Sequence, residues 1–459
     1  MKRLAVVVLA AAIWIIPPPE GLTVPAWHLF AIFIAAIGSV IIGALPILTA
    51  SVFAVAAALL TGLLTPSQAY AGFANSTILL IVMAFLVARA VTKCGLGQRL
   101  GHLAVSWFGR STLGLSYSIF LVDGVIAPAF PSNTARGGVL YPLVLGLAEA
   151  GGATPGNPAR RKLGAYLMFS GMVSLSLSSA LWLTAMAGNP LGAELARHAG
   201  VEITFGSWLI ASSVPTLVAM LVLPWLLIRL MAPEVSSTPD APAAAKRALA
   251  ALGPFSRDEW IVSATFTVMV ALWASAAFIG LDSAAIAFLG LGVLLAAGVL
   301  TAADIAQEGD VLATFIWFAV LFTLSSQLND MGFMGYLGHR LASALGGFGP
   351  IPVYLILIVA YVLMHYLFVS STAHVLALFA VFLDVGVQLG VAAAPFAFML
   401  LFASNFFSTI TPQGSSANLL FAGSGYFSHG ELYRLGAIAT GICLVIYLLV
   451  GTPWLMLIY

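Results

Sequence analysis

Long apolar stretches constrain this sequence more than any other feature. A helix that crosses the hydrocarbon core of a bilayer needs about 20 predominantly apolar residues. Stretches of this kind, forming whole or partial spans, occur at 27–45, 47–64, 77–92, 112–130, 163–186, 208–232, 260–279, 284–300, 311–328, 351–369 and 435–458. Only 7% of the 459 residues are charged, against about 25% in soluble domains, which excludes a water-soluble enzyme. The sequence therefore predicts an all-α polytopic membrane protein with about 11 transmembrane helices.

The charge distribution indicates orientation and excludes one class of partner. Lys and Arg number 17 against 16 Asp and Glu, so the net charge is +1 and no basic face for nucleic acid is expected. Basic residues cluster at 2–3, 89–110, 160–162 and 229–257, which is typical of cytoplasmic loops. No Ser/Arg-rich transit sequence precedes the first span, so we expect a bacterial inner membrane rather than an organelle. The cysteine spacing indicates neither a metal site nor a cofactor.

The two halves of the chain share motifs at a nearly constant spacing. Residues 77–81, Gly95 and His102 match 314–318, Gly332 and His339 at an offset of 237 (314−77, 332−95, 339−102), and 132–136 match 370–374 at 238 (370−132). This spacing predicts a duplicated architecture. The expected divisions are N-terminal spans that are mainly scaffold (1–64), repeat 1 (65–231), a polar linker (232–259), scaffold spans (260–300) and repeat 2 (301–459).

Each repeat carries a short polar motif where the chain is expected to turn back within the membrane. The motifs are Ser132, Asn133 and Thr134 in repeat 1, and Ser370, Ser371 and Thr372 in repeat 2. Their hydroxyl and amide groups, with free backbone N–H groups at a helix N-terminus, suit a carboxylate. Two such clusters facing each other suit a ligand with two anionic ends. The alternative is that these residues only join neighbouring helices, but Pro131 and the symmetry of the motifs favour a site.

Each motif has a downstream partner that disfavours a continuous helix. Repeat 1 contains Asn189 and Pro190 at the end of the segment 184–190, and repeat 2 contains Thr411 and Pro412 within 409–414. A residue that precedes proline avoids the helical conformation, so we predict unwound breaks inside two spans. Ordinary loops at helix ends are the alternative. Duplicated transporters commonly bind substrate near the midplane, where such breaks from the two repeats meet.

The tips and breaks together resemble the divalent anion/sodium symporter family. Residues 131–138, 317–321 and 365–368 are most similar to its branch of plastid 2-oxoglutarate/malate translocators, which also contains bacterial citrate/succinate and tartrate/succinate antiporters. The resemblance covers residues 73–459. It implies eleven spans in two inverted-topology repeats with re-entrant hairpins and broken helices, a homodimer formed through a scaffold domain, and an elevator-type movement.

The same resemblance implies roles for individual residues. The six tip residues would grip the substrate carboxylates, and Asn189 and Thr411–Pro412 would lie in the unwound breaks beside them. The sequence departs from the family at Ser371, where the usual second motif has Asn. This difference shortens one hydrogen-bond donor.

A basic or titratable residue follows each tip at the same distance. Arg136 and His374 lie two positions beyond Thr134 and Thr372. A fixed cation would repel a sodium ion and neutralise part of a dicarboxylate's charge, so we expect these residues to replace sodium. An empty carrier would then retain an uncompensated positive charge, which predicts obligate exchange. The alternatives are a structural ion pair of Arg136 with Asp123, thirteen residues earlier, and a packing role for His374. On the same segment, His365 is expected to be structural.

The sequence leaves rival functions open to different degrees. A membrane-embedded enzyme would need a cluster such as H-E-x-x-H or a G-x-S-x-G turn, and neither motif is present. An anion channel would need a continuous pore, whereas paired breaks suit alternating access. The prediction is therefore a transporter that exchanges C4 or C5 dicarboxylates such as succinate, malate or 2-oxoglutarate. A sodium-coupled dicarboxylate or tricarboxylate symporter is the alternative.

Overall fold

The computed structural model describes residues 2–158 and 161–459. Arg160, which belongs to one of the basic clusters, lies outside these residues. In the described chain the structure is helical throughout, without a β-strand, and 11 helices are long and apolar enough to cross a membrane. The predictions of an all-α polytopic protein and of about 11 spans are confirmed.

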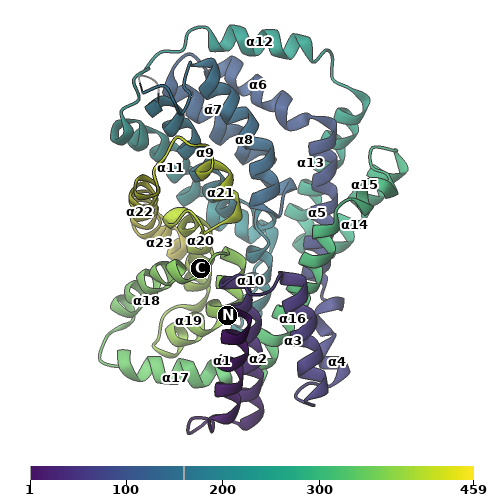
Figure 1. Cartoon of the computed structure of the whole chain (residues 1–459), viewed down its shortest axis with the longest axis vertical. Helices are drawn as coiled ribbons and strands as arrows, with labels where there is room; N and C mark the ends of the chain where they lie inside the picture. Colours follow the sequence, from purple (N-terminus) through teal and green to yellow (C-terminus); the bar gives the residue numbers. More distant parts are fainter. Residues whose placement is uncertain (1, 159–160) are drawn as a thin grey trace.

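Two series of helices follow the same order along the chain. The first comprises α5 (Ser76–Cys94), α6 (Leu96–Phe108), α7 (Thr112–Ile126), α8 (Asn133–Ala150), α9 (Arg161–Leu181), α10 (Gly188–Ala196) and α11 (Phe205–Met231). The second comprises α16 (Gly309–Asp330), α17 (Phe333–Leu345), α18 (Pro350–Met364), α19 (Ser371–Gln388), α20 (Ala393–Phe406), α21 (Ser416–Ala422), α22 (His429–Ile446) and α23 (Thr452–Ile458). The bounds of α6 and α17 differ by 237 at both ends (333−96, 345−108), and those of α8 and α19 by 238 (371−133, 388−150). The two series run in opposite directions, because α6 lies at the top of Figure 1 and α17 at the bottom.

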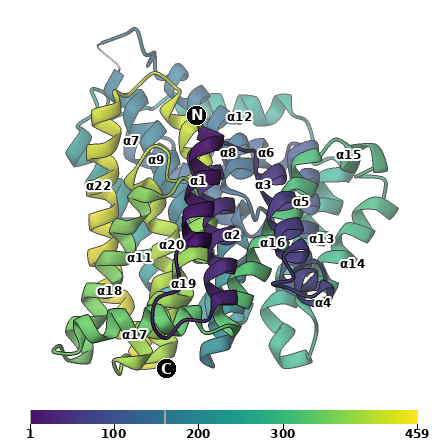
Figure 2. The ribbon, with the colours of Figure 1, turned by 60° about the horizontal axis from the view of Figure 1, so that its bottom comes forward.

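The remaining helices precede the first series or join the two. They are α1 (Lys2–Ile15), α2 (Val24–Ile41), α3 (Ile47–Leu60) and α4 (Pro66–Ala69), followed after the first series by α12 (Ala241–Ala251), α13 (Arg257–Ile279), α14 (Ser283–Ala296) and α15 (Ala302–Ala306). Figures 1 and 2 show α5, α13, α14 and α16 on one side of the molecule, and α9, α20 and α22 on the other. The helix α12 lies across one end and packs against α6.

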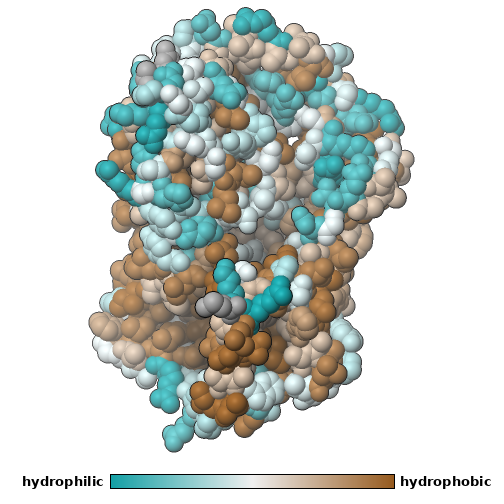
Figure 3. All heavy atoms as spheres, in the orientation of Figure 1, coloured by the Kyte–Doolittle hydropathy of each residue, from teal (hydrophilic) through white to brown (hydrophobic). Residues whose placement is uncertain are grey.

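The distribution of hydropathy over the surface fits an orientation in a membrane. Hydrophobic residues cover most of the lower half of the face shown in Figure 3, and hydrophilic residues gather at the end that carries α12. The linker that contains α12 also includes Lys246 and Arg247. Because cytoplasmic loops are enriched in Lys and Arg, the positive-inside rule predicts that the α12 end faces the cytoplasm.

Local chemistry explains why both hairpins turn at the polar motifs. Pro131 interrupts the chain after α7, because proline donates no backbone hydrogen bond. The Oγ atom of Ser132 then caps α8 by accepting a hydrogen bond from the backbone of Ala135 at 3.2 Å. Ser370 caps α19 in the same way, through the backbone of Ala373 at 3.3 Å. The two polar motifs thus form matching helix N-termini.

Candidate functional site

Four segments from the two repeats meet inside the protein. We call them tip 1 (131–134), break 1 (182–190), tip 2 (370–372) and break 2 (407–415). Break 1 contacts tip 1, because Ala187 N–H donates a hydrogen bond to the carbonyl of Pro131 at 2.9 Å. It also contacts tip 2, where the Thr372 hydroxyl lies 3.7 Å from the sulfur of Met186. Residues of repeat 1 and repeat 2 that lie 186 positions apart (372−186) are therefore neighbours here.

Glycine in break 1 permits this close approach. A Cβ atom placed on Gly188 would lie 3.3 Å from the Cα of Thr372 and 2.8 Å from the sulfur of Met186. Gly188 N–H also donates to that sulfur at 3.1 Å. A side chain at this position would push tip 2 away from break 1.

The two breaks are built alike. A short 3-10 turn, η3 (Leu183–Ala185) or η6 (Phe407–Ile410), interrupts each span, and the flanking residues Trp182, Met186 and Thr411 have extended backbone. The predicted breaks are present, with Pro412 buried in break 2. Asn189 and Pro190 lie just beyond the irregular stretch, in the first turn of α10.

An asparagine side chain holds each break together. The Nδ2 atom of Asn189 donates to the carbonyls of Ser179, at 2.8 Å, and Trp182, at 3.3 Å. The Nδ2 atom of Asn418 donates to the carbonyls of Ser408, at 2.7 Å, and Thr411, at 3.1 Å. All three pairs of positions differ by 229 (418−189, 408−179, 411−182). The repeat-equivalent of Asn189 is thus Asn418, which the offsets of 237 and 238 between the sequence motifs did not indicate.

Arg136 is fully buried behind tip 1, and oxygen atoms surround its guanidinium group. Its Nε atom lies 2.8 Å from Oδ1 of Asp123, which is buried as well. The other contacts, at 2.6–3.2 Å, are with Asn133 Oδ1, Ser179 Oγ and the carbonyls of Leu175 and Ala185. Arg136 therefore connects tip 1, α9 and break 1, and the ion-pair alternative for this residue is what the structure shows.

Asp123 makes further contacts that fix its carboxylate. The hydroxyls of Ser174 and Ser178 on α9 donate to Oδ2 of Asp123 at 2.7 and 2.6 Å. The positive charge of Arg136 is thus compensated by a buried, hydrogen-bonded carboxylate. The expectation of an uncompensated cation at tip 1 is wrong, because spacing along the sequence did not reveal that Asp123 faces Arg136.

In the second repeat a pair of histidines takes the place of the arginine. Nε2 of His365 lies 3.0 Å from the carbonyl of Gly414, and this carbonyl corresponds to that of Ala185 at the offset of 229 (414−185). Nδ1 of His365 lies 3.4 Å from Nδ1 of His374. The His365 ring stacks on Phe407 with 3.9 Å between ring centroids, and both histidines are buried. His365, expected to be structural, therefore links His374 to break 2.

Several buried polar atoms around tip 2 and break 2 have no hydrogen-bond partner among the residues that the structure describes. They are Ser371 Oγ, His374 Nε2, Thr411 Oγ1 and Asn405 Oδ1. Asn405 lies on α20 and donates through Nδ2 to Oδ1 of Asn189 at 2.8 Å, so this cluster extends to break 1. Because most buried polar groups in proteins are paired, such a cluster indicates a place where a polar ligand binds.

The predicted tip residues divide into those with protein partners and those without. Ser132 and Ser370 use their Oγ atoms as helix caps. The Oδ1 atom of Asn133 accepts hydrogen bonds from Arg136 and Ser179, whereas Thr134 is exposed. Thr372 contacts break 1, and Ser371 keeps a buried hydroxyl with no partner in the described structure.

Two cavities flank this junction along α5. One of 610 Å³ lies between α5, α6, α8 and α12 and reaches Gly138 on the helix that begins at tip 1. The other, of 430 Å³, lies at the opposite end of α5 and is lined by Leu183 and Pro190 of break 1. The junction thus lies between cavities that face opposite ends of the molecule.

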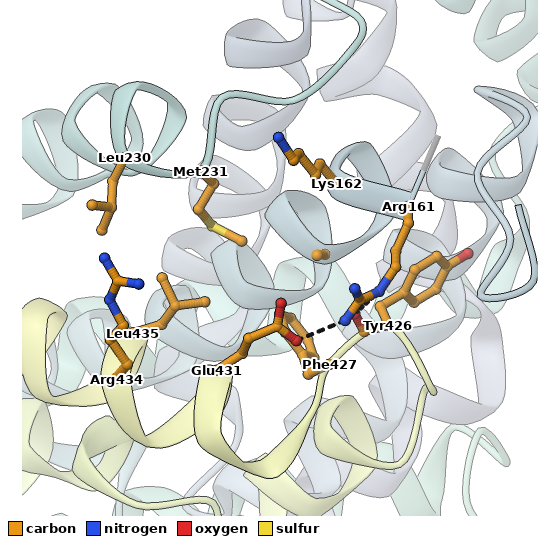
Figure 4. Close-up of a pocket in the computed structure, with 10 residues that line it drawn as sticks. Arg161, Lys162, Leu230, Met231, Tyr426, Phe427, Glu431, Arg434 and Leu435 are labelled. Carbon is orange, nitrogen blue, oxygen red and sulfur yellow. Dashed lines mark hydrogen bonds and ion pairs between the residues drawn. The ribbon is translucent and has the colours of Figure 1, made fainter. Parts of the chain in front are cut away.

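A basic pocket of 320 Å³ lies elsewhere, where α9 and α22 begin and α11 ends (Figure 4). It contains Arg161, Lys162 and Arg434 together with Glu431. Figure 4 shows Arg161 directed at Glu431, with 2.6 Å between Nη2 and Oε2. This pocket contains none of the predicted site residues, yet its cations make it a rival place for an anion.

The chain is similar over its length to known transporters. It is 41% identical over 453 residues to a Bacillus subtilis protein named as malate transporter YflS, covering 98% of this chain and 95% of that protein. It is 38% identical to dicarboxylate transporter 2 of spinach chloroplasts, covering 96% of this chain and 79% of that protein. The citrate/succinate antiporter of Escherichia coli K12 is 30% identical, with 98% and 97% covered.

Two solved structures share the fold at low sequence identity. The YdaH transporter of Alcanivorax borkumensis aligns with a TM-score of 0.57 and 16% identity over 85% of this chain and 87% of that one. MtrF of Neisseria gonorrhoeae aligns with a TM-score of 0.57 and 14% identity over 99% and 98%. The model of the sodium:sulfate symporter transmembrane region matches residues 1–459. The chain is therefore a multi-pass inner-membrane transporter that belongs to the sodium:sulfate symporter family, as its sequence motifs predicted.

Proposed function

We propose that this transporter exchanges C4 or C5 dicarboxylates, such as succinate, malate and 2-oxoglutarate, without sodium. The names of its relatives support the substrate class, since they refer to malate, dicarboxylates, citrate and succinate. The observation that carries sodium independence is the position of the Arg136 guanidinium group within a ring of protein oxygen atoms.

That ring has the composition of a cation site. The oxygens come from two carbonyls (Leu175, Ala185), an amide (Asn133), a hydroxyl (Ser179) and a carboxylate (Asp123), all within 3.2 Å of guanidinium nitrogens. Hard cations bind such oxygen ligands. Because the guanidinium is permanently charged and fills the ring, a second cation would meet both steric and electrostatic repulsion. Arg136 thus holds tip 1 and break 1 together as a bound ion would.

The buried polar atoms without partners at tip 2 and break 2 explain why the empty carrier would cross the membrane slowly. A buried hydroxyl or amide without a partner costs about 1–3 kcal/mol. The hydroxyls of Ser371 and Thr411 would incur this cost whenever the site closes to water without a substrate. A bound carboxylate accepts hydrogen bonds from the two hydroxyls and lowers the barrier to crossing. The loaded carrier should therefore cross the membrane much faster than the empty one.

The geometry of the tips suits a ligand with two carboxylates. The helix α8 begins at tip 1 and α19 at tip 2, so each presents the positive end of a helix dipole. One carboxylate would bind at Ser132, Asn133 and Thr134, and the other at Ser371, Thr372 and Thr411. Asn189, Pro190, Ser370 and Pro412 would shape the site from behind.

Movement of one side of the molecule against the other would complete the transport cycle. In the proposed elevator mechanism, α7–α11 and α18–α23 carry the site past a scaffold that contains α5, α13, α14 and α16. Cavities at opposite ends of α5 support the existence of two access routes. The scaffold would also form a homodimer interface.

Exchange can be tested in proteoliposomes with labelled succinate. Uptake should require unlabelled dicarboxylate inside the vesicles and should not change when choline replaces Na⁺. Arg136→Ala should abolish this uptake, whereas Arg161→Ala, in the basic pocket of Figure 4, should retain it. Concentrative uptake into vesicles without internal dicarboxylate, driven by an inward Na⁺ gradient, would contradict the proposal and favour a sodium-coupled symporter.

A further inference from the structure

The two buried histidines can be assigned protons from their contacts. A carbonyl oxygen only accepts hydrogen bonds, so His365 must carry a proton on Nε2, where it faces Gly414. The contact between the two Nδ1 atoms, 3.4 Å apart, needs one proton between them. These two protons are all that two neutral imidazoles possess. In the neutral pair, Nε2 of His374 is therefore an unprotonated acceptor.

This acceptor is the wrong partner for a carboxylate. Nε2 of His374 is buried and has no partner among the described residues, at the first turn of the helix that begins with tip 2. An ionised carboxylate also only accepts hydrogen bonds. The two groups can pair only if a third proton is present, either on His374 or on the carboxylate itself.

No other nearby group among the described residues supplies the missing positive charge. Arg136 is compensated by Asp123. The titratable side chains that contact His374 are His365 and, on α18, Tyr361, whose ring centroid lies 4.4 Å away. Most charged or titratable residues on the other helices packed against α19, and on α19 itself, have contacts with groups other than His374. Glu194 on α10, Asp330 on α16, Asp384 on α19, and Tyr336 with Arg340 on α17 have such contacts, whereas Asp310 on α16 and His339 on α17 make no hydrogen bond, ion pair or ring contact with His374 in the described structure, and α20 has no charged or titratable residue.

Distance along the helix separates the carboxylate on α19 from this site. Asp384 lies ten residues after His374, which is about 15 Å along the helix axis. Its Oδ2 accepts a hydrogen bond from Gln388 at 2.6 Å. The protonation of the histidine pair is therefore governed by the ligand rather than by a neighbouring charge.

We propose that the His365–His374 pair takes up one proton with each dicarboxylate, so that a proton is a co-substrate of this transporter. This inference rests on the proposed function and adds the coupling ion to it. The proton on His374 Nε2 donates to the substrate carboxylate, and it leaves when the substrate is released. Exchange of two dicarboxylates of equal charge then moves one proton in each direction and remains electrically neutral.

Calorimetry on the purified full-length protein can count this proton. Succinate binding would be measured at pH 7.5 in two buffers with different ionisation enthalpies, and the difference in heat gives the protons taken up. The expected value is near one per succinate, with affinity falling about tenfold for each pH unit above the pKa of the unliganded pair. Binding without proton uptake would overturn the inference and leave dicarboxylate exchange intact. Absence of succinate binding in every buffer would contradict the proposed function and this inference with it.

Three variants separate proton binding from a merely structural role. His374→Gln keeps a donor at the same distance without titration, so succinate should bind without proton uptake. His365→Phe retains the ring stacked on Phe407 but frees the single proton of His374 for Nε2, so affinity should become independent of pH. His339→Gln, on α17, is the matched control and should still take up one proton. Unchanged proton uptake in the first two variants would overturn the assignment.

Discussion

Tip 1 and tip 2 share backbone geometry but differ in how far their polar groups are satisfied. At tip 1, Arg136 fills a ring of oxygen atoms and Asp123 compensates its charge. At tip 2, His374 faces His365, and Ser371 and Thr411 keep unpartnered hydroxyls in the described structure. The comparison supports the proposal that repeat 1 supplies a preassembled half of the substrate site, whereas repeat 2 is completed by the ligand.

The largest loss of stability should follow from breaking the ion pair between Asp123 and Arg136 behind tip 1. Asp123→Ala leaves the Arg136 guanidinium buried without its counter-charge, which typically destabilises a protein by about 3–5 kcal/mol. The thermal unfolding midpoint in detergent should fall strongly. The matched control is Asp258→Ala, which removes an exposed ion pair with Arg257, worth about 0–1 kcal/mol. Equal shifts in the two variants would show that the pair does not hold tip 1 together.

The asparagines that hold the breaks offer a test of the symmetry. Asn418→Ala leaves two buried carbonyl groups without a donor and should cost about 2 kcal/mol. Asn189→Ala should cost somewhat more, because Asn405 also donates to Asn189. Thermal unfolding of both variants, beside Asn329→Ala on α16 as a control, measures the difference. If Asn189→Ala lowered the unfolding midpoint and Asn418→Ala did not, the asparagine would stabilise the break in the first repeat only.

The smallest effect on stability is expected at tip 2, where Ser371 and Ser370 should differ in their roles. Ser371→Ala removes a hydroxyl with no protein partner in the described chain, so it should leave the unfolding midpoint unchanged. It should raise the KM for succinate about ten- to a hundredfold, since a hydrogen bond to a charged group contributes about 1.5–3 kcal/mol. Ser370→Ala removes a helix cap and should lower stability by about 1 kcal/mol with less change in KM. The reverse pattern would assign substrate binding to Ser370 instead.

Local sequence chemistry predicted much of this architecture. Apolar runs predicted most of the candidate spans but not those of α19 and α20, and Pro131 with the Ser-Asn-Thr motif predicted the turn at tip 1. The interruptions near Pro190 and Pro412 were predicted as well, because proline and small polar residues disfavour a continuous helix.

Contacts between distant segments could not be predicted in the same way. Asn418 escaped notice because the offset between the repeats falls from 238 at the tips to 229 at the breaks, a difference of nine residues (238−229). Asn405 lies in the apolar helix α20 and gains its role only through contact with Asn189, 216 positions away. The sequence offered the Asp123–Arg136 pair as an alternative, but only the packing of α7 against α8 and α9 shows that the two side chains meet.

The most direct test of this account is an experimental structure determined with succinate in sodium-free buffer. The account predicts density for the ligand between the two tips, with one carboxylate within hydrogen-bond distance of Ser371 Oγ, Thr411 Oγ1 and His374 Nε2. The Arg136 guanidinium should keep its oxygen partners. Density in the basic pocket of Arg161, Lys162 and Arg434, with the polar atoms of tip 2 still unpartnered, would contradict it.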